Sequence, residues 1–182
     1  RMGYVLKKTV VLVGMMGSGK TAVGTALARI LGVPFLDSDA EIETAANMTI
    51  AEIFERDGEP FFRSKESQVI GRLLETRVCV LSTGGGAFLS ADNRRMISER
   101  GVSVWLRADI DLLWQRVRHK ATRPLLRTAD PYGTLTALAH AREPSYAKAD
   151  LVVDAHPGYA IDDMAQKVAE ALLTRPDVLE AR

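Results

Sequence analysis

Short apolar runs alternate with longer amphipathic stretches along this chain. Five runs have the length and composition of buried strands, namely residues 9–13, 33–36, 78–81, 102–106 and 151–153. The segments between them repeat apolar side chains at the spacing of helices. Strands that alternate with helices predict an α/β fold of three layers, in which helices cover both faces of a five-stranded parallel sheet. Ligands of such folds lie beyond the carboxyl ends of the strands.

The first strand leads into a glycine-rich segment, Gly14 to Thr21, that fits the phosphate-loop pattern G-x-x-x-x-G-K-[ST]. Its backbone N–H groups can converge on phosphate oxygens, and the helix that follows points its positive end at the same anion. A turn that binds nothing is the alternative, but the strand before the loop and the helical spacing after it favour ATP. The predicted nucleotide-binding residues of this loop are Gly17, Ser18, Gly19, Lys20, Thr21 and Ala22.

The composition of the chain limits its partners. The 182 residues, 47% of them hydrophobic, suit one domain over 1–182. A formal charge of +1 provides no general field for nucleic acid or a membrane surface. The single cysteine, Cys79, lies in an apolar run, and no signal peptide or membrane span is evident. We therefore expect a monomer of the cytoplasm, with no nucleic acid and no membrane as partners.

Two carboxylates, Asp37 and Asp39, follow the second strand. In an extended segment they would point to opposite sides, so that Asp37 faces a metal ion and Asp39 faces a second substrate. The alternative is that Asp39 caps a helix that begins at Ala40. The third strand does not end in an aspartate, which leaves Asp37 as the nearest candidate for the metal side.

Residues 40–75 have the pattern of helices, with a capping-box signature at 49–52. We predict that Phe54 and Phe62 form an apolar wall with Arg63 at its edge, where the guanidinium can bind a carboxylate through two hydrogen bonds. An ordinary core for the aromatic rings, and a surface ion pair of Arg63 with Glu59 or Glu66, remain open as alternatives.

Three consecutive glycines, Gly84, Gly85 and Gly86, follow the third strand. They allow the backbone to approach a ligand closely, or they form a turn that needs positive φ. Their place at the carboxyl end of a strand favours the ligand.

A basic segment over 116–127 indicates a flap whose arginines neutralise charge on a transferring phosphoryl group, although a solvated basic loop is the alternative. Arg142 would add a second guanidinium near this flap. The loop over 154–158 is a candidate purine site, a last helix is expected over 160–173, and we expect no regular structure after Pro176.

The chain resembles the shikimate kinases almost from end to end. The matching motifs are Gly14 to Thr21, Asp37-Ser38-Asp39, Phe62-Arg63 with Glu66, Gly84-Gly85-Gly86, Arg123-Pro124-Leu125-Leu126, and Arg142-Glu143-Pro144-Ser145-Tyr146 followed by Ala149-Asp150. The resemblance implies a P-loop fold of the nucleoside monophosphate kinase type with sheet order 2-3-1-4-5. It also implies a substrate-binding helical region over about 37–66 and a lid over about 117–130. The family transfers the γ-phosphoryl of ATP to the 3-hydroxyl of shikimate in aromatic amino-acid biosynthesis.

On the acceptor side, the resemblance implies that Asp39 holds the hydroxyls of shikimate and takes the proton. Arg63 and Arg142 would bind its carboxylate. The resemblance also implies that Gly85 and its neighbours Gly84 and Gly86 contact the ring, and Phe54 and Phe62 complete the predicted substrate-binding residues.

On the nucleotide side, the resemblance implies that Thr21 ligates Mg²⁺ directly and that Asp37 holds it through water. Lys20 and Arg123 would stabilise the transferring phosphoryl group, which makes Lys20, Asp39 and Arg123 the catalytic residues. The family often has an acidic residue between its two lid arginines, where this chain has 119–122. Arg116 is preferred to Arg118 for stacking on adenine because of its spacing to Arg123.

Two other functions would account for some of these predicted site residues. A kinase of the gluconate type would use the same groups, since gluconate also carries hydroxyls and one carboxylate. A nucleotide-binding module without catalysis is the other alternative, but it gives no chemical reason for Lys20, Thr21, Asp39 and Arg123 to occur together.

Overall fold

A computed structural model describes residues 3–119 and 127–182. Its main sheet has five parallel strands in the order β3-β4-β2-β5-β6. These strands are β2 (Thr9–Val13), β3 (Phe35–Asp37), β4 (Val80–Ser82), β5 (Gly101–Arg107) and β6 (Leu151–Asp154). Because a short extra strand, β1, precedes them, this order is the predicted 2-3-1-4-5 shifted by one number, and the prediction is confirmed.

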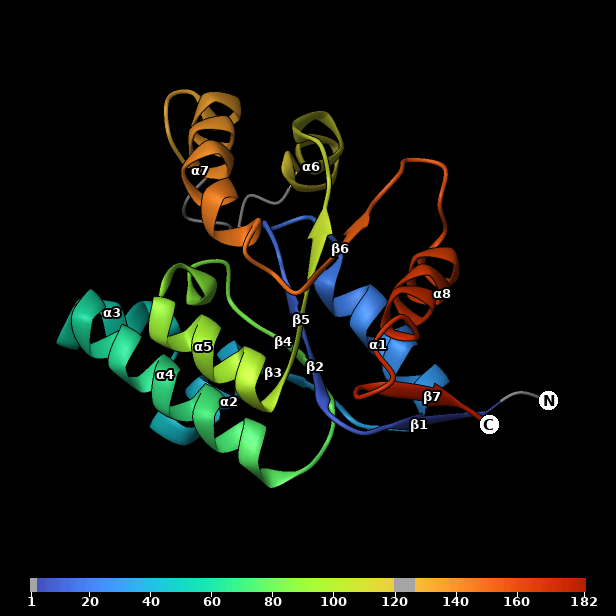
Figure 1. Cartoon of the computed structure of the whole chain (residues 1–182). Helices are drawn as coiled ribbons and strands as arrows, with labels where there is room; N and C mark the ends of the chain where they lie inside the picture. The colour runs from blue at the N-terminus through green and yellow to red at the C-terminus, as the bar shows by residue number, and fades with distance from the viewer. Residues whose placement is uncertain (1–2, 120–126) are drawn as a thin grey trace.

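Helices cover both faces of the sheet (Figure 1). On one face lie α1 (Lys20–Leu31) and α8 (Ile161–Leu172). On the other lie α2 (Ser38–Ala46), α3 (Ile50–Asp57), α4 (Glu59–Thr76), the 3₁₀ turn η1 (Ala87–Leu89) and α5 (Ala91–Arg100). Beyond the carboxyl ends of the strands stand α6 (Ile110–Val117) and α7 (Pro131–Tyr146). None of the described helices is long and apolar enough to cross a membrane.

The central strand β2 is buried along its whole length. Val10 and Leu12 pack into the core on the side of α1 and α8, whereas Val11 and Val13 pack into the core on the opposite face. This alternation follows from the period of two in a strand, and it explains why the strand has no polar face. The predicted three layers are therefore confirmed.

Two strand predictions began too early. The N–H of Val33 bonds to the carbonyl of Ala28 in the turn that ends α1, so β3 begins only at Phe35. The run predicted over 78–81 contributes its strand at Val80–Ser82, and Cys79 lies buried just before it as a free thiol. The capping box was predicted correctly, since Thr49 Oγ1 accepts from the N–H of Glu52.

The end of the chain is ordered, contrary to the prediction. Residues Leu179–Ala181 form β7, which pairs antiparallel with β1 (Tyr4–Leu6) in a separate two-stranded sheet. Val178 and Leu179 are buried, because they pack into the core beside α8 and β2. This packing supplies the stability that a three-residue strand cannot provide by itself.

Candidate active site

The register of the sheet brings three loops to one edge. Asp37 at the end of β3 pairs with Ser82 at the end of β4, and Ser82 in turn pairs with Leu12 of β2. The phosphate loop, the Asp37-Ser38-Asp39 segment and the three glycines therefore leave the sheet side by side. Together with α3, α4, α6 and α7 they surround a cavity of about 740 Å³. Almost every site residue predicted from the sequence lines this cavity.

The phosphate loop has the backbone that its glycines permit. Gly14, Gly17 and Gly19 have φ of +148°, +84° and +97°, which side chains rarely allow. Lys20 folds back over the loop, and its Nζ donates to the carbonyls of Gly14 at 2.6 Å and Met15 at 3.1 Å. The amine therefore already lies over the space that the loop encloses.

Ser18 sits behind the phosphate loop rather than on the cavity wall. Its side chain is 2% exposed, and its hydroxyl finds no hydrogen-bond partner among the described residues. A buried hydroxyl without a partner is costly, which suggests a partner such as a bound phosphate or water.

The helix cap after β3 is Asp37, not Asp39. Its Oδ1 accepts from the N–H of Asp39 at 2.8 Å and of Ala40 at 3.4 Å, and α2 begins at Ser38. The alternative in which Asp39 caps the helix is therefore wrong. So is the extended geometry assumed for the pair, because Asp39 is already in the first turn of α2. Both carboxylates nevertheless line the cavity.

Asp39 has the electrostatics of a general base. Burial, followed by the nearby carboxylates of Asp37 and Glu66, raises its pKa to about 6, against the opposing charge of Lys20. Its Oδ1 is buried and has no hydrogen-bond partner in the described part of the chain. A carboxylate that is desolvated and still faces a cavity can accept a proton from a hydroxyl near neutral pH.

The three glycines pack closely against charged side chains. None of Gly84, Gly85 and Gly86 has a positive φ. A Cβ on Gly84 would lie 2.8 Å from Asp39 Oδ1, and one on Gly86 would lie 2.5 Å from Arg63 Nη2. A Cβ on Gly85 would collide with Arg142 Nη1. The positive-φ turn is therefore excluded, and the backbone lies directly against the base and both arginines.

The two predicted guanidinium groups converge on this glycine segment. Arg63 donates to Glu66 Oε1 at 2.9 Å and to Glu59 Oε2 at 3.3 Å, and Glu66 is 1% exposed. The ion pairs of Arg63 with Glu59 and Glu66, which were the alternative, therefore exist. The same Arg63 guanidinium also packs against Gly86. Arg142 differs, because its buried Nε has no hydrogen-bond partner among the described residues. Such a donor suits an anionic ligand.

An aromatic wall borders the arginines. The rings of Phe54 and Phe62 lie 4.8 Å apart, and the guanidinium of Arg63 lies 5.3 Å from the centre of the Phe62 ring. Phe62 is 4% exposed and Phe54 36% exposed. Phe62 is therefore part of the core, which is the alternative considered for the aromatic rings. Both rings also line the cavity, as predicted for an apolar wall.

On the nucleotide side, α6 packs against the phosphate loop. Arg116 Nη1 donates to the carbonyl of Gly17 at 2.9 Å, and a Cβ on Gly17 would lie 2.8 Å from Val117 Cγ1. Arg118 instead bonds to His119 and is exposed. Arg123 lies outside the described residues, as do residues 120–126 of the predicted lid as a whole.

The oxygen ligands near Lys20 fit magnesium. Thr21 and Asp37, which carry a hydroxyl and a carboxylate, line the same cavity as the phosphate-loop lysine. Among residues 3–119 and 127–182 there is no group of three or more His, Cys, Asp or Glu side chains that could hold a metal. Mg²⁺ does not need one, since it is held by few protein oxygens together with waters and substrate phosphates.

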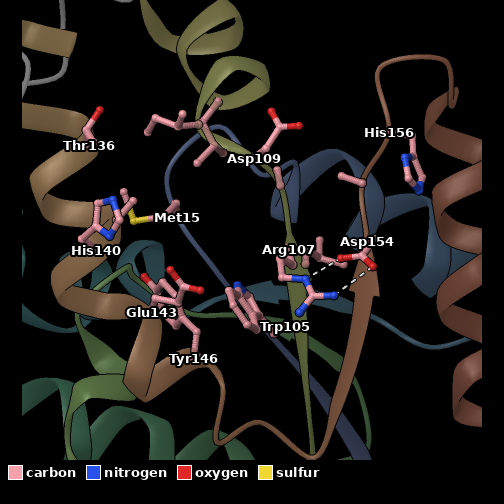
Figure 2. A pocket seen from close by; sticks show the side chains of 16 residues that line it. Met15, Trp105, Arg107, Asp109, Thr136, His140, Glu143, Tyr146, Asp154 and His156 are labelled. Atoms are coloured by element: carbon pink, nitrogen blue, oxygen red, sulfur yellow. Dashed lines mark hydrogen bonds and ion pairs between the residues drawn. The ribbon is translucent and has the colours of Figure 1, made fainter. Parts of the chain in front are cut away.

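A second cavity of about 440 Å³ lies behind α6, between α7 and the ends of β5 and β6 (Figure 2). Arg107 and Asp154 form an ion pair at its edge, with Arg107 Nη2 3.0 Å from Asp154 Oδ2. Its wall includes Tyr146, which the sequence motif contained but which was not predicted as a site residue. The signal available was spacing, since Tyr146 follows Arg142 by one helical turn.

Comparison with known proteins agrees with this geometry. The family model described as shikimate kinase matches residues 16–173. A shikimate kinase of Cereibacter sphaeroides is 71% identical over 175 residues, which are 96% of this chain and 87% of the relative. One of Ruegeria pomeroyi is 70% identical over 96% of this chain and 90% of the relative.

Solved structures show the same relationship. The shikimate kinase from Acinetobacter baumannii in complex with shikimate has a TM-score of 0.85 and 41% identity, over 92% of this chain and 93% of that one. A gluconokinase from Sinorhizobium meliloti, with a TM-score of 0.64 and 19% identity over 93% of this chain and 94% of that one, shares the fold alone. The chain belongs to the shikimate kinase family.

Proposed function

We propose that this protein transfers the γ-phosphoryl group of ATP to the 3-hydroxyl of shikimate. One observation carries the acceptor side of this proposal: a base of raised pKa and two guanidinium groups all lie against three consecutive glycines, opposite the phosphate-loop lysine. Shikimate is a small ring with one carboxylate and three hydroxyls. Its binding site therefore needs cationic groups for the carboxylate, a group that accepts hydrogen bonds from the hydroxyls, and backbone that can pack against the ring. The cavity supplies all three.

The reaction joins two ends of one cavity. Asp39 accepts the proton of the acceptor hydroxyl, whose oxygen forms a bond to the γ-phosphorus. The bond between this phosphorus and the oxygen that bridges the β- and γ-phosphates breaks, and ADP leaves. Arg63 and Arg142 bind the carboxylate, and thereby hold the hydroxyl in line with the phosphoryl group.

Lys20 and the phosphate-loop N–H groups stabilise charge on the transferring group, and Arg123 joins them from the predicted lid. Thr21, and Asp37 through water, would hold Mg²⁺, which would neutralise phosphate charge when bound. Arg116 stacks on adenine in this scheme. Its guanidinium now bonds to Gly17, at the base of the loop that would hold the phosphates.

An acceptor screen tests the function. We expect ADP release from ATP and Mg²⁺ to depend on shikimate, and the product to be shikimate 3-phosphate by mass spectrometry. Gluconate serves as the competing acceptor, because it has the same functional groups on an open chain. Equal ATP turnover with and without shikimate, or a preference for gluconate, would overturn the proposal. ATP binding without any turnover would indicate the inactive module.

We further propose that the protein is a cytoplasmic monomer. The buried free thiol of Cys79 agrees with a reducing compartment. Light scattering at assay concentration tests the monomer, and fractionation of the source cells tests the location.

A further inference from the structure

Tyr146 separates the active-site cavity from the second cavity. It is the last residue of α7, it is 1% exposed, and its ring lies 5.8 Å from that of Trp105. Figure 2 shows it beside Trp105, below Glu143 on the same helix. Its hydroxyl crosses to the glycine segment and donates to the carbonyl of Gly85 at 2.7 Å.

This hydrogen bond holds the carbonyl of the middle glycine, whereas those of Gly84 and Gly86 accept from the backbone N–H groups of Ala87 and Leu89. Three glycines in sequence have no side chains to restrict their φ and ψ angles, so the segment is intrinsically the most permissive part of the site. Because a peptide unit is planar and trans, holding the carbonyl of Gly85 also sets the direction of the N–H of Gly86. The orientation of the surface that faces the acceptor ring therefore depends on Tyr146.

The same tyrosine is next to the arginine that faces Gly85. Arg142 precedes Tyr146 by four residues, which places both side chains on one face of α7. The guanidinium packs so closely on Gly85 that a Cβ there would collide with it. Burial raises the pKa of the Tyr146 hydroxyl and Arg142 opposes this shift, in agreement with their proximity.

The support behind Tyr146 is rigid. Trp105 is 7% exposed on the central part of the sheet, next to β2 and β6. The tilted stacking of the two rings fixes the phenol, and the phenol in turn connects the sheet to the glycine segment. The chain of contacts runs from Trp105 through Tyr146 to Gly85 and Arg142.

From these contacts we propose that Tyr146 is a positioning residue for the acceptor carboxylate and ring. It acts through the Gly85 carbonyl and the placement of Arg142, and it takes no part in the transfer of the phosphoryl group. This role rests on the proposed function, because it assigns Tyr146 to the binding of the acceptor rather than of ATP.

Tyr146→Phe removes only the hydroxyl and keeps the ring on Trp105. The loss leaves the Gly85 carbonyl without its bond, and we expect KM and Kd for shikimate to rise about tenfold. KM for ATP and the thermal midpoint should stay close to those of the unaltered protein. Calorimetric titration with shikimate, together with initial rates at varied concentrations of each substrate, measures this division.

Tyr132→Phe is the matched control. It removes a tyrosine hydroxyl from the same helix, where the bond to Asp111 is exposed and faces α6. We expect no change in shikimate affinity for this variant. An unchanged KM for shikimate in Tyr146→Phe, or an equal rise in both KM values, would overturn the proposal. A failure of the proposed function would instead appear in the unaltered protein, as ATP turnover that does not need shikimate.

Discussion

The two ends of the active-site cavity are built in different ways. The proposed phosphate-binding end is one continuous segment, in which β2, six loop residues and the start of α1 follow one another. The proposed acceptor end is assembled from Asp39 on α2, Arg63 on α4, the glycines after β4 and Arg142 on α7. A nucleotide site can thus be encoded locally, whereas the acceptor site depends on how separate elements pack. The two ends should therefore respond differently to substitution.

The largest effect is expected at the acceptor base. Asp39→Asn removes the proton acceptor, and we expect kcat to fall by about 10³ while ATP affinity is kept. The thermal midpoint at pH 7 should rise, because a carboxylate with a raised pKa destabilises the fold when it is ionised. Steady-state kinetics and thermal melts measure both changes. Asp92→Asn, which removes an exposed carboxylate on α5, is the control and should change neither; unchanged turnover in Asp39→Asn would refute the role.

The next effect separates the phosphate end from the acceptor end. Lys20→Ala removes the charge held over the phosphate loop, and we expect kcat to fall by about 10² because the transferring group loses its stabilisation. The Kd for shikimate should not change, since no acceptor contact is lost. Kinetics and calorimetry test this, with Lys8→Ala on the opposite side of the molecule as control. Loss of shikimate binding in Lys20→Ala would contradict the division into two ends.

A methyl group on the glycine segment should damage the acceptor end alone. In Gly84→Ala the new Cβ would stand 2.8 Å from Asp39 Oδ1, so that the base must move. Displacement of a catalytic group by about 1 Å costs about 10² in rate, which we expect in kcat/KM for shikimate. Gly3→Ala, whose Cβ would meet nothing closer than 3.9 Å, is the control. Wild-type kinetics in Gly84→Ala would show that the packing is not needed.

The smallest effect is the pH dependence of the acceptor end. With a pKa of about 6, Asp39 is ionised at pH 7 and becomes protonated as the pH falls through 6. We expect kcat/KM for shikimate to drop about tenfold per pH unit below this value. The pH profile of ATP affinity is the internal control. A profile that stays level down to pH 5 would remove Asp39 from the role of base.

This division also explains what could be predicted from the sequence. The phosphate loop and the five sheet strands depend on local pattern, and they were predicted with errors of about two residues at the ends. Asp37 and Asp39 show where local pattern fails. Aspartate is a good helix cap at either position, and only the structure shows that α2 begins at Ser38 with Asp37 as its cap.

Tertiary packing decided the remaining cases. The glycines 84–86 allowed either a positive-φ turn or a close approach, and distances to side chains on distant elements were needed to choose. Strands β1 and β7 are too short to be predicted, because each exists only by pairing with the other. The link from Tyr146 to Gly85 spans 61 residues and has no local signal except its spacing from Arg142.

The contact of the glycines with Asp39, Arg63 and Arg142 has an evolutionary consequence. A side chain at Gly84, Gly85 or Gly86 would displace the residue it faces, so we expect the effect of such a substitution to depend on which residue stands there. A new acceptor specificity reached by one replacement at a time is therefore expected to pass through a less active enzyme. The phosphate end, which touches the acceptor end across the cavity, can meanwhile remain as it is. Divergence of this fold toward other acceptors is therefore expected to proceed by paired replacements.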